Sequence, residues 1–293
     1  MDLTSRSRSR SRLPARPAQP AAPALPDLPA SRTEADGSAV VRVLTYNIRS
    51  LRDDEDALAR VIRACAPDLV FVQEAPRFFR WRKHAARLAA TCDLVVLSGG
   101  ATAAGPLLLC SLRAFVERTE DVLLPLTPGL HRRGFATAVV RFGGARVAVL
   151  SAHLPLDARE RQAHAEELLV RLGAAGAPYG IAAGDVNETP EGPAFRRLAG
   201  ALQDCRAIAP WGGEHTFVPG GRGGRGGGGA GGGGGAGRRI DAVFATRGVE
   251  VLGCGVPVGL DGVVEADLTA ASDHLPVLAV VRLPVSAPRA AGG

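Results

Sequence analysis

The chain of 293 residues has few aromatic side chains and a single lysine. Phe, Trp and Tyr together make up 4% of the residues, so we expect few ring surfaces on which nucleobases could stack. The net charge of +6 is carried almost entirely by arginine, because Lys83 is the only lysine. Ala and Gly are also abundant, so the arginine content indicates a coding bias more than nucleic-acid binding.

Disulfides, membrane spans and a secretory signal are also missing from the pattern. The cysteines are odd in number, contain no C-x-x-C pair and mostly lie in or beside apolar runs; they are Cys65, Cys92, Cys110, Cys205 and Cys254. Buried free thiols in a reducing compartment explain them best. No apolar run approaches the roughly 20 residues of a membrane span, and the N-terminus lacks the apolar segment of a signal peptide. These absences predict a cytoplasmic protein without a transmembrane segment.

Six short polar fragments stand at the edges of apolar runs. They are T-Y-N at 45–47, Q-E at 73–74, S-A-H at 151–153, G-D-V-N at 184–187, R-I-D at 239–241 and S-D-H at 272–274. The first four follow β-like runs and the last two precede such runs. If four strands end where two begin, all six fragments can meet at one edge of a mixed sheet system. Carboxylates, amides and imidazoles gathered there are the groups that metal-assisted hydrolysis uses.

The composition divides the chain into a tail, one domain and two flexible segments. Residues 1–38 combine an Arg/Ser repeat with a Pro/Ala-rich stretch, which predicts a disordered tail; a basic arm for nucleic acid or acidic lipid is the alternative. The domain spans 39–284, and 285–293 form a flexible C-terminus. A Gly-rich insertion at 220–237 is typical of a flexible linker, although its R-G-G pattern leaves RNA contact open.

Hydrophobic periodicity predicts a mixed α/β domain. We expect strands near residues 40–48, 69–73, 94–97, 107–111, 122–124, 136–142, 146–152, 179–183, 240–245, 249–252 and 277–283. Helices are expected after Asp53 or Asp54 and near residues 78–90, 158–172 and 193–202. Gly143 and Gly144 between two β-like runs indicate a hairpin.

In order and spacing, the six fragments resemble the endonuclease/exonuclease/phosphatase superfamily of metal-dependent phosphoesterases. The resemblance runs from about Val41 to Leu283. No single fragment is specific, but six of them in the family's order are strong evidence. The resemblance implies an α/β fold: a four-layered sandwich of two mixed β-sheets packed face to face with flanking helices, as in deoxyribonucleases.

The resemblance also implies a metal site. By it, Glu74 is the main ligand of Mg²⁺, for which Mn²⁺ is a possible substitute, and Asn47 and Asp273 complete or steer the coordination shell. The residues agree with this assignment, because Glu74 follows an apolar strand, where an ionised carboxylate needs a cation. A hard divalent ion prefers such oxygen ligands. Without the other fragments, Glu74 would be read as a surface glutamate at a strand end.

Two histidines and three Asx side chains are the candidate catalytic residues. His153 and His274 are acid–base candidates, because imidazole titrates near neutral pH. The resemblance implies that Asp185 orients or deprotonates the attacking water and can contact a second metal. It also implies that Asn187 donates to the phosphate. We expect Asp241 to accept a hydrogen bond from one of the two imidazoles, and the sequence leaves open which one.

These residues predict a Mg²⁺-dependent phosphoesterase that hydrolyses phosphodiesters. Arg133, in H-R-R-G-F, lies where several family members place a phosphate-contacting arginine, and His153 stands where abasic-site endonucleases carry asparagine. A nuclease-type monomer acting on nucleic acid is the favoured reading. A phosphatase or phospholipase-type enzyme for a small phosphorylated metabolite or lipid headgroup is the alternative. A third hypothesis is an inactive nucleic-acid-binding module.

Overall fold

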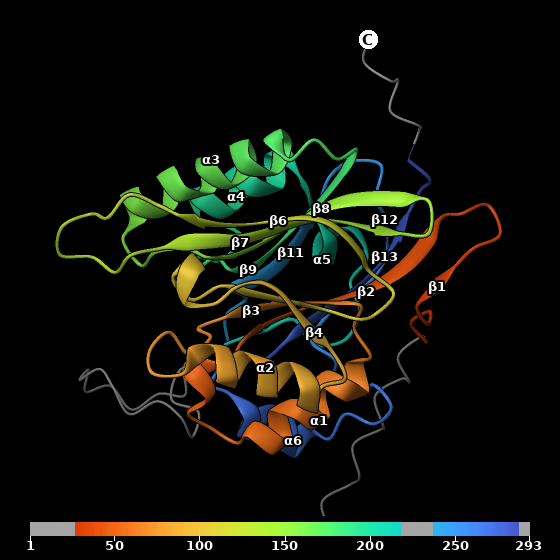
Figure 1. The fold of residues 1–293 in the computed structure, drawn as a ribbon, viewed down its shortest axis with the longest axis horizontal. Coiled ribbons are helices and arrows are strands. Elements are labelled where there is room, and N and C mark those ends of the chain that lie inside the picture. Colours follow the sequence, from red (N-terminus) through yellow and green to blue (C-terminus); the bar gives the residue numbers. More distant parts are fainter. Residues whose placement is uncertain (1–26, 218–236, 287–293) are drawn as a thin grey trace, which may run out of the picture.

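The structure, a computed structural model, describes residues 27–217 and 237–286 (Figure 1). Two mixed β-sheets pack face to face, and helices cover the outer face of each. The first sheet has seven strands, in the order β12-β13-β2-β3-β5-β4 with β1 added on β2. The second has six, in the order β10-β11-β9-β8-β7-β6. This four-layered sandwich is the fold that the sequence predicted.

The first sheet and its helices form the lower two layers of Figure 1. Its strands are β1 (Arg32–Thr33), β2 (Ala39–Asn47), β3 (Leu69–Gln73), β4 (Val95–Gly99), β5 (Leu107–Cys110), β12 (Glu250–Gly255) and β13 (Val277–Leu283). Its helices are α1 (Glu55–Cys65), α2 (Trp81–Thr91) and α6 (Glu265–Ala271), and two 3-10 turns are η1 (Arg49–Leu51) and η2 (Ala101–Ala103).

The second sheet and its helices form the upper two layers. Its strands are β6 (Phe115–Leu123), β7 (Gly134–Phe142), β8 (Ala145–His153), β9 (Tyr179–Asp185), β10 (Gln203–Asp204) and β11 (Asp241–Ala245). Its outer face is covered by α3 (Ala158–Ala174) and α4 (Pro193–Ala201), and the short α5 (Cys205–Ile208) follows β10. The predicted hairpin is present, since Phe142 of β7 pairs with Ala145 of β8 across Gly143 and Gly144.

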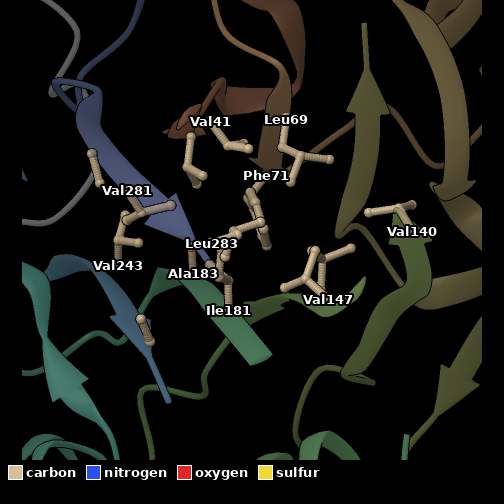
Figure 2. Packing of buried hydrophobic residues seen from close by; sticks show 14 of the residues in the cluster. Val41, Leu69, Phe71, Val140, Val147, Ile181, Ala183, Val243, Val281 and Leu283 are labelled. Carbon is tan, nitrogen blue, oxygen red and sulfur yellow. The ribbon is translucent and has the colours of Figure 1, made fainter. Parts of the chain in front are cut away.

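The core between the sheets is built from small and branched apolar side chains. Figure 2 shows Val41 and Phe71 of the first sheet facing Ile181 and Val243 of the second. The alternate residues of the same strands point outward into two further clusters under the helices. Central strands such as β2 are therefore buried on both faces, which is why they appear in the sequence as continuous apolar runs.

Strand directions bring the polar fragments to one end of the sandwich. In the first sheet, β2 and β3 are parallel and β13 runs antiparallel to β2. In the second sheet, β8 and β9 are parallel and β11 runs antiparallel to β9. The ends of four strands thus meet the beginnings of two, as expected from the sequence.

Most predicted elements appear within a few residues of their expected bounds, and the exceptions have physical causes. Helix α1 is capped by Asp54, whose carboxylate accepts from the backbone amides of Asp56 and Ala57. Helix α2 begins three residues later than expected, at Trp81, because Phe78 opens a turn in which Arg80 is left-handed (φ 56°). Strand β6 is longer than expected because it is an exposed edge strand without an apolar pattern.

The folded part of the chain begins before residue 39, which corrects the predicted tail boundary of 1–38. Strand β1 pairs with β2, and Ser31 Oγ donates to the Asp68 carboxylate at 2.5 Å. Leu28 packs against the cluster under α1. Residues 1–26, 218–236 and 287–293 lie outside the described residues. Ser286, however, is tied to β8, because its hydroxyl accepts from the Arg146 amide.

All five cysteines are free and buried, as the sequence predicted. Burial raises the pKa of each thiol. Within residues 27–217 and 237–286, no helix is both long and apolar enough to cross a membrane.

Candidate active site

A cleft of about 310 Å³ opens at the end of the sandwich where the polar fragments meet. It is lined by Ser50, Arg52, Glu74, Arg77, Ala104, Gly105, His131, Arg133, His153, Leu156, Asp185, Asn187 and His274. Six of the nine site residues predicted from the sequence belong to this lining. Asn47 and Asp241 are not part of the lining, but each is hydrogen-bonded to a lining residue, and Asp273 forms an ion pair with Arg49.

Asp185, the last residue of β9, is the centre of the site. It is buried, and register places it opposite His153 of β8 and Asp241 of β11. Its Oδ2 atom accepts from Asn47 Nδ2 at 3.1 Å, lies 3.4 Å from His153 Nε2, and is 3.8 Å from His274 Nε2. One carboxylate oxygen therefore joins groups from both sheets.

The G-D-V-N turn is built so that Asp185 and Asn187 both reach the cleft. A Cβ atom at Gly184 would lie 1.8 Å from the carbonyl oxygen of Ala152, so only glycine lets β9 approach β8 this closely. Asp185 Oδ1 accepts from the backbone amide of Asn187, which is left-handed with φ 55°. Asn187 Nδ2 donates one of its protons to the carbonyl of Leu154. The loop is thereby fixed to the end of β9 and to the segment that follows β8.

The structure assigns Asp241 to His274, a pairing that the sequence left open. His274 Nδ1 lies 2.9 Å from Asp241 Oδ2, and both side chains are buried. The buried Thr216 hydroxyl accepts from the backbone amides of Ile240 and Asp241 at 3.1 Å each. The ring of Phe217 lies 5.0 Å from that of His274. The segment before the Gly-rich insertion thus holds the pair in place.

The two histidines have opposite electrostatic environments. Burial lowers the pKa of His153 to about 4, despite the attraction of Asp185. Burial also acts on His274, but Asp241 and, further away, Asp185 outweigh it and raise its pKa to about 10. Burial and the neighbouring Asp241 raise the pKa of Asp185. At neutral pH the site therefore contains one charged and one neutral imidazole.

Glu74 and Asn47 form the part of the site that fits a divalent metal best. Glu74 follows β3 with a left-handed backbone (φ 54°), and its Oε1 atom accepts from Asn47 Nδ2 at 3.4 Å. Two carboxylates, those of Glu74 and Asp185, thus converge on one weak amide donor. An oxygen-rich set of this kind suits Mg²⁺ or Mn²⁺. Asn47 Oδ1 accepts from the amide of Arg49, so a ligand role requires its side-chain amide to turn over.

Two further features bear on where a metal would be held. Asp273 forms an ion pair with Arg49 at 3.2 Å. Asp185, Asp241 and His274 bring potential ligand atoms within 4.8 Å of one another, and Asp241 Oδ1 is buried without a hydrogen-bond partner among the described residues. His274 Nδ1 and Asp241 Oδ2 already bond each other at 2.9 Å, so an acid–base pair explains this group better.

Arginines supply positive charge around the cleft. Arg133 is the arginine of H-R-R-G-F that lines it, together with Arg77 and Arg52. Burial lowers the pKa of Arg133, and the nearby carboxylates of Asp185 and Glu74 oppose this shift. In contrast, Arg239 of the R-I-D fragment forms a bidentate pair with Asp204 and does not line the cleft.

The sequence assigned no role to two positioning residues, although one of them, Ser272, belongs to the S-D-H fragment. Ser272 donates to the carbonyl of Asn47 at 2.7 Å and so ties the S-D-H fragment to the T-Y-N fragment. The hydroxyl of Thr216 accepts from the amides of Ile240 and Asp241, which lie 24 and 25 positions further along the chain. Only the three-dimensional structure shows what their hydroxyl groups contact.

An α/β sandwich with carboxylates, amides, histidines and arginines at the ends of its two sheets defines a class of hydrolase-like proteins that handle anionic substrates. The sequence model of the endonuclease/exonuclease/phosphatase family matches residues 44–274. This chain belongs to the endonuclease/exonuclease/phosphatase family. No curated protein matches its sequence significantly.

Solved structures show the same fold. The endonuclease/exonuclease/phosphatase from Bacteroides vulgatus aligns with a TM-score of 0.67 and 19% identity, covering 83% of this chain and 99% of that one. Truncated TDP2 from Caenorhabditis elegans aligns with a TM-score of 0.64 and 19% identity, covering 83% of this chain and 97% of that one. TDP2 from D. rerio, complexed with a single-strand DNA product, aligns with a TM-score of 0.59 and 17% identity. The alignment covers 83% of this chain and 98% of that one. At these identities the likeness concerns the fold.

Proposed function

We propose that the protein is a metal-dependent phosphodiesterase of nuclease type. The observation that carries the proposal is the position of Asp185, whose Oδ2 atom lies within 3.8 Å of Asn47, His153 and His274 side-chain nitrogens at the floor of a cleft rimmed by arginines. A buried carboxylate in that position is suited to accept a proton from water. The single-strand DNA product bound to the zebrafish structural neighbour supports a nucleic-acid substrate.

Glu74 and Asn47 would hold the metal ion, Mg²⁺ or Mn²⁺. Asp273 would contribute a further ligand if its ion pair with Arg49 breaks. When bound, the ion polarises the phosphoryl group and lowers the pKa of a coordinated water. The position of Glu74 at the end of β3, beside the cleft, makes it the residue on which metal binding depends most.

The chain's own residues divide the remaining work. Asp185 accepts the proton of the attacking water, and His153, whose Nε2 atom faces it, fixes the orientation of that carboxylate. His274, charged and held by Asp241, donates its Nε2 proton to the oxygen that leaves as the P–O bond breaks. Asn187 offers its second amide proton, and Arg133 pairs with the substrate's negative charge.

The first test replaces the proposed base. With Mg²⁺ or Mn²⁺ and bis(4-nitrophenyl) phosphate as substrate, Asp185→Asn should lower kcat by roughly 10²- to 10⁴-fold. Glu166→Gln is the matched control, because it makes the same carboxylate-to-amide change in a surface ion pair with Arg197. Equal activity in the two variants would exclude Asp185 as the base.

The second test concerns the metal. Glu74→Gln should remove most activity without loss of fold, because an amide lacks the negative charge that binds the cation. Excess chelator should inactivate the parent protein reversibly, and Mg²⁺ or Mn²⁺ should restore it. Undiminished hydrolysis in excess chelator would contradict metal dependence.

A phosphatase or phospholipase-type enzyme is the second candidate, because a cleft of about 310 Å³ is at the small end of ligand sites. Comparing bis(4-nitrophenyl) phosphate with 4-nitrophenyl phosphate, DNA and RNA separates the two. The inactive nucleic-acid-binding module is the least supported, since it has no need of the buried His274–Asp241 pair. Cytoplasmic location and a monomeric state stay predictions.

A further inference from the structure

Two phenylalanines stand almost fully exposed beside the cleft. Phe78 and Phe79 lie in the turn between Glu74 and helix α2, with 82% and 81% of their surface exposed. The low aromatic content suggested few surfaces for base stacking, yet three aromatic residues, Phe78, Phe79 and Trp81, fall within four positions of the chain here. Adjacent, fully exposed phenylalanines are uncommon on a globular protein and mark a contact surface.

Positive charge surrounds these rings. Arg77 lies 5.9 Å from the centroid of Phe78, and Arg80 lies 5.0 Å from that of Phe79. Arg82 is 4.3 Å from the ring of Trp81. Residues 75–92 contain no Asp or Glu. The surface therefore combines aromatic faces with cations, which suits a ligand that is both aromatic and anionic.

Arg77 connects the aromatic surface with the cleft. Its guanidinium donates to the carbonyl of Ala104 at 3.2 Å, so its position is fixed. It lines the cleft with Glu74 and Arg133 while lying against Phe78. A chain of phosphates leaving the cleft past Arg77 would bring its next base to Phe78 and Phe79.

We propose that Phe78 and Phe79 form a stacking platform for unpaired nucleobases next to the phosphodiester in the cleft. Bases in a duplex hide their faces, so the platform selects single-stranded nucleic acid. The inference rests on the proposed function, because it takes the cleft as the phosphodiester site. A lipid surface is the competing occupant, but Arg77 joins the rings to the cleft itself, as a substrate strand requires.

Binding of fluorescent oligonucleotides tests the platform. The experiment uses the Asp185→Asn background with Mg²⁺, so that hydrolysis does not confound the measurement by anisotropy. Replacing both rings (F78A with F79A) should weaken binding of a short single strand by roughly 10- to 100-fold, since each stacked base contributes substantially. Substituting tryptophan at both positions should retain binding. Leu112→Ala, which removes another exposed apolar side chain, is the matched control.

Three outcomes overturn the proposal. One is affinity within twofold of the background in the double alanine variant, and another is a parent that prefers duplex to single strand. The third is loss of binding to phosphatidylserine-containing vesicles while oligonucleotide binding is unchanged, which would make the platform a membrane contact. Hydrolysis of bis(4-nitrophenyl) phosphate by the parent tests the catalytic proposal separately, so the two can fail independently.

Discussion

At the scale of single residues, the site is organised by one carboxylate oxygen. Asp185 Oδ2 is approached by His153 at the end of β8, by Asn47 at the end of β2 and by His274 in the loop before β13. The residue types and their order along the chain predicted this group, because each fragment stands at a strand end. The pairing within the group could not be predicted, since His153 and His274 are equivalent as sequence patterns.

The pairing of Asp241 with His274 leads to a prediction about coupling. Asp241→Asn and His274→Gln should each lower kcat, by roughly 10²- to 10⁴-fold, because each removes one partner of a buried hydrogen bond that orients the imidazole. The double variant should lose little more than either single variant, since the two residues act as a unit. Steady-state kinetics of the four proteins checks this. Independent, multiplicative losses would show that the residues act separately.

The same cycle with His153 provides the control. Combining Asp241→Asn with His153→Gln should give larger losses than combining Asp241→Asn with His274→Gln. Asp241 is hydrogen-bonded to His274, whereas the carboxylate close to His153 is that of Asp185, at 3.4 Å. Equal coupling of both histidines to Asp241 would contradict the geometry.

At the scale of elements, the buried strands were the predictable part. Strand β3 has the predicted bounds because five apolar or strand-end residues, Leu69–Gln73, are all buried. Strand β6 and helix α6 were not predictable in the same way. Strand β6 is largely exposed and charged, and α6 is a short segment that buries only Leu268 and Ala271. Hydrophobic periodicity arises from burial, so elements that bury few residues show little periodic pattern in the sequence.

A buried ion pair joins three elements behind the catalytic loop. Arg161 of α3 contacts Glu188 Oε1 through two nitrogens, at 3.0 and 3.2 Å, and also donates to the carbonyls of Pro155 and Leu156. Glu188 Oε2 accepts from two backbone amides at the start of α4. The pair thus fixes the loops that follow both His153 and Asn187.

Removing Arg161 should destabilise the protein strongly. Arg161→Leu leaves a buried carboxylate without its partner, so the free energy of unfolding should fall by about 3–5 kcal/mol. Arg197→Leu breaks an exposed pair between Glu166 of α3 and Arg197 of α4, and solvent screening should make its effect on stability much smaller. Urea unfolding of both variants measures the difference. Equal losses would mean that the buried pair contributes no more than a surface one.

At the scale of the whole molecule, the sandwich places two sheets so that the ends of their strands share one cleft. Neither sheet has a complete site: Glu74 and Asn47 belong to the first, whereas Asp185, His153 and Asp241 belong to the second. The sequence predicted the layers only through the family resemblance that six fragments in one order carry. It did not predict where the folded chain begins, since residues 27–38 contribute a few contacts and no periodic pattern.

Those N-terminal contacts give the last prediction. Removing residues 1–38 deletes β1, the packing of Leu28 and the hydrogen bond from Ser31 to Asp68, whereas removing residues 1–26 keeps all three. Asp68 also accepts from the amide of Arg42, whose guanidinium donates to the carbonyl of Pro29. The 39–293 protein should therefore be less stable than the 27–293 protein by about 2–4 kcal/mol, because it loses one partly buried leucine and a few hydrogen bonds. Urea unfolding of the two truncations, with Leu28→Ala in the full chain as an intermediate case, measures this difference. Equal stability of the two truncations would mean that the stable domain begins at residue 39 and that β1 does not contribute to its stability.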